Sequence, residues 1–282
     1  MKTLPVVIEE IEQAKDNLEF IPTGFKLVDR HLDGGMMRKE LVVLGAPSGL
    51  GKSNVACQIF LNVAQKGFKS AYFSLEISNE MTVCRMIGAL ANLKPTWIMA
   101  GLLTSEEFER KTEAKERLLA FADYMSFYDH LYTLDEITKE IKENKYEFVV
   151  IDFIQNIVSK GKDEYDRLSR AAIDLQKLAK ETNSCIMVLS QLSNQVAREG
   201  DKAPNVEYRG SGSIAMVCDL GFFIQREKAV AMDAVLNKLS LMLRKNRRGI
   251  AGVGFELIFL HPGGYIYDFT DKAQPDIVAK ID

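Results

Sequence analysis

Cysteine and histidine are scarce in this chain and widely scattered. Its 282 residues include four cysteines, none of them in a C-x-x-C pair, and three histidines. Closely spaced cysteines and histidines are the usual signal for structural zinc, and paired cysteines signal a disulfide framework. Neither signal is present, so we expect reduced thiols buried among apolar neighbours and no zinc site made by protein side chains.

Long hydrophobic runs and a large excess of charge are also missing. No apolar stretch approaches the ~18 residues of a membrane-spanning helix, and the first residues do not form a basic-then-apolar signal sequence. The formal net charge is −3, so only local basic patches could attract nucleic acid or an anionic membrane. We therefore expect a cytoplasmic protein without a membrane partner.

The pattern of apolar residues changes along the chain. In the first two thirds, continuous apolar runs alternate with amphipathic helical segments, whereas the final third has strand-like segments joined by short turns. Continuous apolar strands are typical of a parallel sheet covered on both faces. We therefore predict an α/β fold with a mainly parallel central sheet flanked by helices, and antiparallel strands at its C-terminal edge. The expected strands are 41–45, 70–75, 148–152, 185–189, 220–225, 239–243, 253–259 and 265–269, and the expected helices are 54–65, 79–92, 104–121, 134–144 and 165–182.

Two units are expected. Residues 1–20 contain one short amphipathic pattern, with Val6, Val7, Ile8 and Ile11 among acidic residues. Such a helix has too few apolar positions to fold alone, so we expect it to dock on something else. Residues 21–282 are expected to form a single domain.

The most informative segment is a glycine-rich turn between a predicted strand and a predicted helix. It reads Ala46-Pro47-Ser48-Gly49-Leu50-Gly51-Lys52-Ser53 and fits the phosphate-binding pattern G-x-x-x-x-G-K-S/T, with alanine at the first position. Backbone N–H groups of such a turn and of the following helix start favour an anion. We expect these eight residues to bind a nucleoside triphosphate, Lys52 reaching its β- and γ-phosphates and the Ser53 hydroxyl holding Mg²⁺.

Polar residues follow three other predicted strands. Asp152 ends the run Phe148-Val149-Val150-Ile151, Glu76 follows Tyr72-Phe73-Ser74-Leu75, and Gln191 follows Val188-Leu189-Ser190. Ligand-binding groups of open α/β sheets lie at the carboxyl ends of the strands. We expect Asp152 to hold Mg²⁺, Glu76 to act as the base toward the attacking water, and Gln191 to sense the γ-phosphate.

Two segments offer cations or backbone amides to an anion. Arg244-Lys245-Asn246-Arg247-Arg248-Gly249 packs four cations before a predicted tight turn. On residue pattern alone, these cations reach either a nucleotide held by a neighbouring copy or DNA phosphates. Arg209-Gly210-Ser211-Gly212 is a small-residue loop that either contacts a nucleic-acid backbone or has no ligand.

Together, these segments resemble the motor domain of the DnaB-type replicative hexameric DNA helicases, within the RecA-like family of P-loop NTPases. The resemblance runs from about residue 21 to 269, and the order and spacing of its segments are more specific than any single one. The segments are Pro22-Thr23-Gly24-Phe25, the phosphate loop, Ser74-Leu75-Glu76-Ile77-Ser78, Val150-Ile151-Asp152-Phe153-Ile154-Gln155, Leu189-Ser190-Gln191-Leu192, Arg209-Gly210-Ser211-Gly212 and Lys245-Asn246-Arg247-Arg248-Gly249.

The resemblance implies an ATP-hydrolysing, magnesium-dependent ring of six subunits with ATP sites between neighbours. Lys245 and Arg247 would then reach the adjacent site, and the loop from Arg209 to Gly212 would grip single-stranded DNA. The chain departs from the family pattern at Gly210, where the family has an acidic residue. Residues 1–20 are similar to a linker helix that docks on a neighbouring subunit, and a helical N-terminal domain usually precedes that linker. Both a phage-type form and an N-terminally truncated form fit this departure.

The resemblance further implies a 5′-to-3′ replicative helicase in a bacterial or phage-infected cell, with primase and a helicase loader as partners. Two alternatives remain open at this stage. One is a RecA-like recombination or repair ATPase that forms open filaments on DNA. The other is a nucleotide-switched loader or scaffold ATPase in which hydrolysis only controls assembly.

Overall fold

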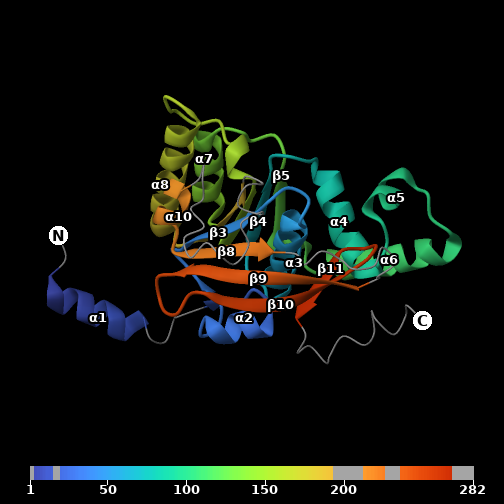
Figure 1. The fold of residues 1–282 in the computed structure, drawn as a ribbon, viewed down its shortest axis with the longest axis horizontal. Coiled ribbons are helices and arrows are strands. Elements are labelled where there is room, and N and C mark those ends of the chain that lie inside the picture. The colour runs from blue at the N-terminus through green and yellow to red at the C-terminus, as the bar shows by residue number, and fades with distance from the viewer. Residues whose placement is uncertain (1–2, 15–19, 193–211, 226–235, 269–282) are drawn as a thin grey trace.

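A computed structural model describes residues 3–14, 20–192, 212–225 and 236–268. Its central sheet has nine strands in the order β11-β10-β9-β8-β3-β7-β6-β4-β5 (Figure 1). The strands are β3 (Leu41–Ala46), β4 (Ser70–Ser74), β5 (Met125–Tyr128), β6 (Phe148–Asp152), β7 (Cys185–Gln191), β8 (Leu220–Gln225), β9 (Leu236–Asn246), β10 (Val253–Leu260) and β11 (Tyr265–Asp268). The short strands β1 (Phe20–Ile21) and β2 (Met36–Met37) pair separately.

Helices cover both faces of this sheet (Figure 1). They are α1 (Leu4–Ala14), α2 (Lys26–His31), α3 (Lys52–Gln65), α4 (Asn79–Ala91), α5 (Pro95–Ala100), α6 (Ser105–Leu119), α7 (Leu134–Asn144), α8 (Glu164–Thr182) and α10 (Gly212–Val217). Capping boxes fix the starts of α6 and α7, where Thr104 pairs with Glu107 and Thr133 with Glu136. None of the described helices is both long and apolar enough to cross a bilayer.

Side chains of the central strands alternate between two apolar cores. Val42 and Leu44 of β3 pack in the core that contains α3, whereas Leu41 and Val43 pack in the core that contains α7 and α8. Every residue of β3 is therefore buried. This explains why the parallel strands read as continuous apolar runs.

The predicted sheet is confirmed, with one correction at its C-terminal side. Strands β9, β10 and β11 are antiparallel to their neighbours. However, β8 runs parallel to β3, with Val42 opposite Leu220, and only its other edge is antiparallel. Strand β8 therefore belongs to the parallel part of the sheet, because α10 returns the chain to the same end from which β3 starts.

The elements at the two ends of the molecule are less packed. Helix α1 lies apart from the sheet in Figure 1, and its apolar side chains are exposed, with Leu4 at 72% and Ile8 at 46%. The hairpin-like group α5–α6 projects at the opposite end. The short helix α5 and the edge strand β5 were not expected from the sequence. Strand β5 is only half-buried throughout, so its apolar pattern is weak.

The four cysteines are free thiols, as expected. Three of them, Cys57, Cys185 and Cys218, are buried, and Cys84 is half-buried. Burial raises the pKa of Cys57 to about 12 and that of Cys218 to about 11. These thiols are therefore neutral structural groups rather than reactive thiolates.

Candidate functional site

The predicted phosphate loop connects β3 directly to α3. Its glycines adopt the left-handed conformation, with φ of +79° at Gly49 and +87° at Gly51. At Gly49 a Cβ would meet open space, so backbone conformation rather than crowding calls for glycine. Gly51 is the N-cap of α3 and supplies no side-chain cap. The first N–H groups of α3 are therefore not held by a cap side chain, which suits an anion.

Lys52 is the first residue of α3 and is 9% exposed. Burial lowers the pKa of Lys52, and the carboxylates of Asp152 and Glu76 act in the opposite direction. The Lys52 ammonium also lies 5.0 Å from the centre of the Phe153 ring. Ser53, the next residue, is half-buried. The site thus holds a buried cation near two carboxylates, next to an anion-binding helix start.

The sheet brings the other predicted residues to the same edge. Strands β4, β6, β7 and β3 are neighbours, with β6 between β4 and β7. Ser74 lies opposite Asp152, and Gln191 lies opposite Ala46. The expectation that the carboxyl ends of these strands meet beside the phosphate loop is therefore met in the fold.

Asp152 has one satisfied and one unsatisfied oxygen. Its side chain is 1% exposed, and Oδ2 accepts a hydrogen bond of 2.9 Å from the Tyr72 hydroxyl. Oδ1 is buried and has no hydrogen-bond partner among the described residues. An orphaned buried carboxylate oxygen is costly, and a cation or an ordered water removes that cost.

This orphaned oxygen fits a magnesium site. Mg²⁺ is usually bound by one or two protein oxygens together with phosphate oxygens and water. The Ser53 hydroxyl and Asp152 Oδ1 are of this kind. Within the described ranges, no cluster of three or more His, Cys, Asp or Glu side chains could bind a metal by itself, which agrees with a metal that arrives with its nucleotide.

Tyr72 is a member of the site that the sequence patterns did not reveal. Its side chain is buried on β4, donates to Asp152, and lies 3.7 Å from the Cys57 sulfur. Burial, together with the nearby Asp152 carboxylate, raises the pKa of Tyr72 well above its usual value. Tyr72 is therefore a neutral donor that orients one Asp152 oxygen and leaves the other available. Only its apolar strand position was visible in the sequence.

Glu76 and Gln191 are both exposed at their strand ends. Ser78 caps α4, accepting a hydrogen bond from the Met81 N–H, so Glu76 is not needed as the cap. The segment after Gln191 returns to the phosphate loop, because the Leu192 N–H donates to the Ala46 carbonyl at 3.1 Å. Both side chains are accessible to a ligand at this edge.

The predicted basic segment lies at the end of β9 and in the turn before β10, and its cations differ in their surroundings. Lys245 donates to the Met216 carbonyl of α10 at 2.7 Å. Arg247 donates to the same carbonyl at 3.1 Å and to the Asp219 carboxylate at 3.0 Å, and its side chain is 46% exposed. A helix carbonyl end favours such cations.

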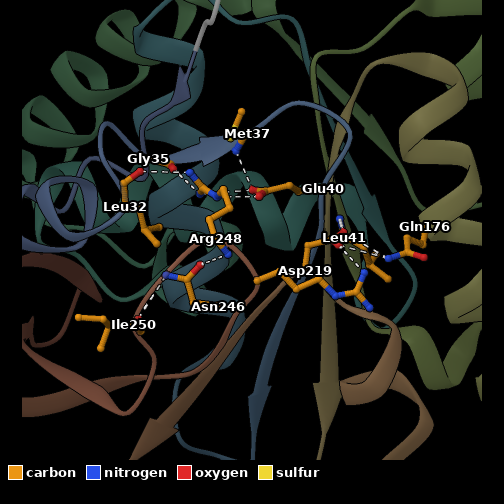
Figure 2. A network of polar contacts seen from close by, with 11 residues as sticks. Leu32, Gly35, Met37, Glu40, Leu41, Gln176, Asp219, Asn246, Arg248 and Ile250 are labelled. Carbon is orange, nitrogen blue, oxygen red and sulfur yellow. Dashed lines mark hydrogen bonds and ion pairs between the residues drawn. The ribbon is translucent and has the colours of Figure 1, made fainter. Parts of the chain in front are cut away.

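Arg248 does not project from the turn as the sequence pattern indicated. Figure 2 shows it turned inward against Glu40, with Arg248 Nε 2.8 Å from Glu40 Oε1 and its other nitrogens on the Leu32 and Gly35 carbonyls. Burial raises the pKa of Glu40, and the Met37 N–H and Arg248 oppose that shift. Arg248 is therefore a structural cation that fixes the base of the turn.

Removal of the Arg248 guanidinium should destabilise the fold. Arg248→Met leaves the Glu40 carboxylate buried without its cation and is expected to lower the free energy of unfolding by about 3 kcal/mol in a urea titration. The control is Lys238→Met, which breaks an exposed ion pair with Glu256 between β9 and β10 and should change stability by less than about 1 kcal/mol. Equal losses in the two variants would contradict the buried role of Arg248.

The predicted DNA loop falls mostly outside the described residues. Arg209, Gly210 and Ser211 lie there, and Gly212 is the first residue of α10. Helix α10 packs on α8. Its Met216 carbonyl holds both Lys245 and Arg247, so the segment after the predicted DNA loop and the predicted trans cations are in direct contact.

Residues 20–262 match the family model of the DnaB-like helicase C terminal domain. The chain belongs to this family.

Relatives agree with the membership in the DnaB-like family. The chain is 31% identical over 255 residues to the replicative DNA helicase DnaC of Bacillus subtilis (strain 168) and to the replicative DNA helicase DnaB of Geobacillus stearothermophilus. Each alignment covers 87% of this chain and 56% of the relative. The chain therefore spans little more than half the length of these relatives.

Two solved structures have the same fold. One is an isolated ATPase domain, which superposes with a TM-score of 0.81 at 25% identity, covering 94% of this chain and 96% of that one. A DnaB-like replicative helicase, solved in a study of its interactions with primase, superposes with a TM-score of 0.80 at 24% identity. That superposition covers 94% of this chain and 65% of the helicase. The fold is thus the RecA-like one of DnaB-family ATPase domains.

Proposed function

We propose that this chain is the ATP-driven motor of a replicative DNA helicase. The observation that carries the proposal is the grouping of Lys52, Asp152 and Glu76 beside an uncapped helix start at one sheet edge. The naming of the DnaB-like relatives as replicative DNA helicases supports the same activity. The motor would move along single-stranded DNA as a hexameric ring and unwind duplex in the 5′-to-3′ direction.

Each site residue has a distinct task in ATP hydrolysis. The phosphate loop from Ala46 to Ser53 cradles the phosphates, and Lys52 neutralises charge that develops on the β- and γ-phosphates. Ser53 and Asp152 would hold Mg²⁺, which supplies charge neutralisation between the phosphates when bound. Glu76 orients the attacking water and accepts its proton. Gln191 senses whether the γ-phosphate is present.

The hydrolysis site is completed by a neighbouring subunit in this proposal. Arg247 is half exposed although it already contacts Met216 and Asp219, and its guanidinium has five N–H donors in all. Lys245 lies two residues away on the same edge. We therefore assign both to the neighbour's nucleotide, where an arginine can raise the hydrolysis rate by about 10³–10⁵.

Mixed rings test this assignment. Arg247→Ala subunits and Glu76→Gln subunits should each be nearly inactive alone. In an equal mixture, about a quarter of interfaces join an intact Glu76 to an intact Arg247 across the boundary, so up to about a quarter of wild-type phosphate release should return. No recovery after subunit exchange would mean that both residues act within one subunit.

The N-terminal helix and the DNA loop have separate roles. Residues 1–20 would dock α1 on a neighbouring subunit, which would cover exposed apolar side chains such as Leu4 and Ile8. Residues 21–282 would form the motor, with Arg209 to Gly212 contacting DNA phosphates inside the ring. Such contacts are sequence-tolerant and weaken with salt.

The partners in this proposal are those of a replication fork. Single-stranded DNA is the track, ATP is the substrate, and Mg²⁺ accompanies the nucleotide. Primase and a helicase loader are further partners, proposed because the chain belongs to the DnaB-like family. The bacterial relatives support action in the cytoplasm of a bacterial or phage-infected cell.

The decisive test is the rate of ATP hydrolysis with and without single-stranded DNA, over a range of protein concentrations. A replicative motor predicts a rate that rises with DNA and steepens with concentration, followed by 5′-to-3′ strand separation. DNA-stimulated hydrolysis in open filaments without unwinding would instead indicate a recombination ATPase. A slow rate that ignores DNA would indicate a switch ATPase.

A further inference from the structure

A short 3-10 helix, η3 (Ile154–Asn156), begins two residues after Asp152. It follows β6, which has β4 on one side and β7 on the other. Glu76 lies just beyond β4, and Gln191 ends β7. Helix η3 is therefore next to both strand ends that carry the proposed base and sensor.

Asn156 contacts the strand end that leads to Glu76. Its Nδ2 donates to the Leu75 carbonyl at 2.9 Å, and the Leu75 N–H donates to the Asp152 carbonyl at 2.8 Å. Both backbone groups of Leu75 are thus held by the segment from Asp152 to Asn156. Because the peptide unit is planar, fixing the Leu75 carbonyl also fixes the Cα of Glu76.

Gln155 contacts the strand end that carries Gln191. Its Nε2 donates to the Gln191 carbonyl at 3.0 Å and to the Ser190 hydroxyl at 3.2 Å. Its Oε1 accepts from the Gln191 N–H at 3.3 Å. The amide of Gln155 therefore binds both backbone groups of Gln191, as a neighbouring strand residue would.

The helix that carries these two amides is itself anchored. Ile154 is fully buried and Ile157 is 1% exposed, and both belong to the core under α7 and α8. Consecutive side chains on a rigid turn can thus reach opposite neighbours of β6. A catalytic group held in this way keeps its position without its supporting residues touching the substrate.

We propose that Asn156 and Gln155 are positioning residues that fix Glu76 and Gln191 relative to Asp152. The inference rests on the roles proposed above for Glu76 and Gln191. Asn156 sets the approach of the base to the water, and Gln155 sets the sensor. A displacement of about 1 Å at such a group reduces turnover by about 10²-fold.

The test compares Asn156→Ala with wild type in three measurements: kcat for ATP hydrolysis, affinity for a fluorescent ATP analogue, and amide hydrogen exchange of the peptide covering residues 74–78. We expect kcat to fall about 10- to 100-fold, nucleotide affinity to stay within about twofold, and exchange at Leu75 and Glu76 to accelerate about tenfold. Asn156→Leu, which keeps the side-chain volume without the donor, should behave alike.

Two further variants complete the design. Gln155→Met should accelerate exchange at residues 190–192 rather than 74–78, with affinity again retained. The matched control is Asn144→Ala, which removes a side-chain-to-carbonyl hydrogen bond to Glu140 on α7, and all three readouts should stay at wild-type values.

The proposal is overturned if the Asn156 variants exchange like wild type at residues 74–78. It is also overturned if kcat stays within twofold, or if nucleotide affinity falls as much as kcat. A wild-type chain that does not hydrolyse ATP would contradict the proposed function instead. The exchange measurements would still decide whether the two amides hold the strand ends.

Discussion

Substitution of Lys52 by alanine is expected to reduce ATP hydrolysis by about 10³-fold or more. Lys52 is a cation that is buried at the phosphate loop and held close to the Asp152 and Glu76 carboxylates. Charge develops on the phosphates during transfer, and a preorganised cation in a water-poor site stabilises it strongly. The loss should appear as phosphate release near background, with or without single-stranded DNA.

Lys66→Ala is the matched control, because Lys66 follows the end of the same helix and is exposed. It should retain wild-type turnover. The Lys52 variant should also bind ATP more weakly, since a contact to the β- and γ-phosphates is gone. Normal hydrolysis by the Lys52 variant would contradict the phosphate-loop assignment itself, and with it the proposed motor.

The sheet was largely predictable because its core strands are buried on both faces. Strands such as β3 and β6 have apolar residues at every position that packs, so they stand out as continuous runs. Strand β5 was missed because an edge strand that is only half-buried needs no such run. The direction of β8 was also hidden, since a strand's residues are the same whichever way its neighbour runs.

The candidate site was predictable only where one residue type follows one strand. The phosphate loop, Glu76, Asp152 and Gln191 each follow an apolar run, and the sheet order then brings them together. The contacts that support them join residues far apart in the chain. Tyr72 with Asp152 and Asn156 with Leu75 are about 80 residues apart, and only the folded sheet makes them neighbours.

The inward turn of Arg248 shows the same limit. In the sequence, Arg248 is one of four clustered cations, and solvent exposure is the usual outcome for such a cluster. In the fold, Glu40 is buried more than 200 residues earlier in the chain and needs a cation. Charge clusters are therefore sorted by their tertiary partners: Arg248 becomes structural, whereas Arg247 stays half exposed at the edge proposed to meet a neighbouring subunit.

Substitution of Glu76 by glutamine should separate nucleotide binding from hydrolysis. Glutamine keeps the size and hydrogen-bonding reach of the side chain but cannot accept a proton from water at neutral pH. We expect hydrolysis to fall by about 10³-fold, while affinity for ATP changes little because Lys52 and the phosphate loop are intact. Removal of one of the two carboxylates near Lys52 also reduces electrostatic repulsion of the incoming phosphates.

The measurement is a pair of experiments on one preparation: single-turnover hydrolysis of radiolabelled ATP, and equilibrium binding of the same nucleotide. Glu80→Gln serves as the control, because Glu80 is an exposed carboxylate four residues away in the first turn of α4, and it should leave both values unchanged. If Glu76→Gln loses ATP binding together with hydrolysis, Glu76 shapes the pocket rather than activating water. If it keeps both, the base must be another group, and the strand end held by Asn156 would lose its proposed catalytic purpose.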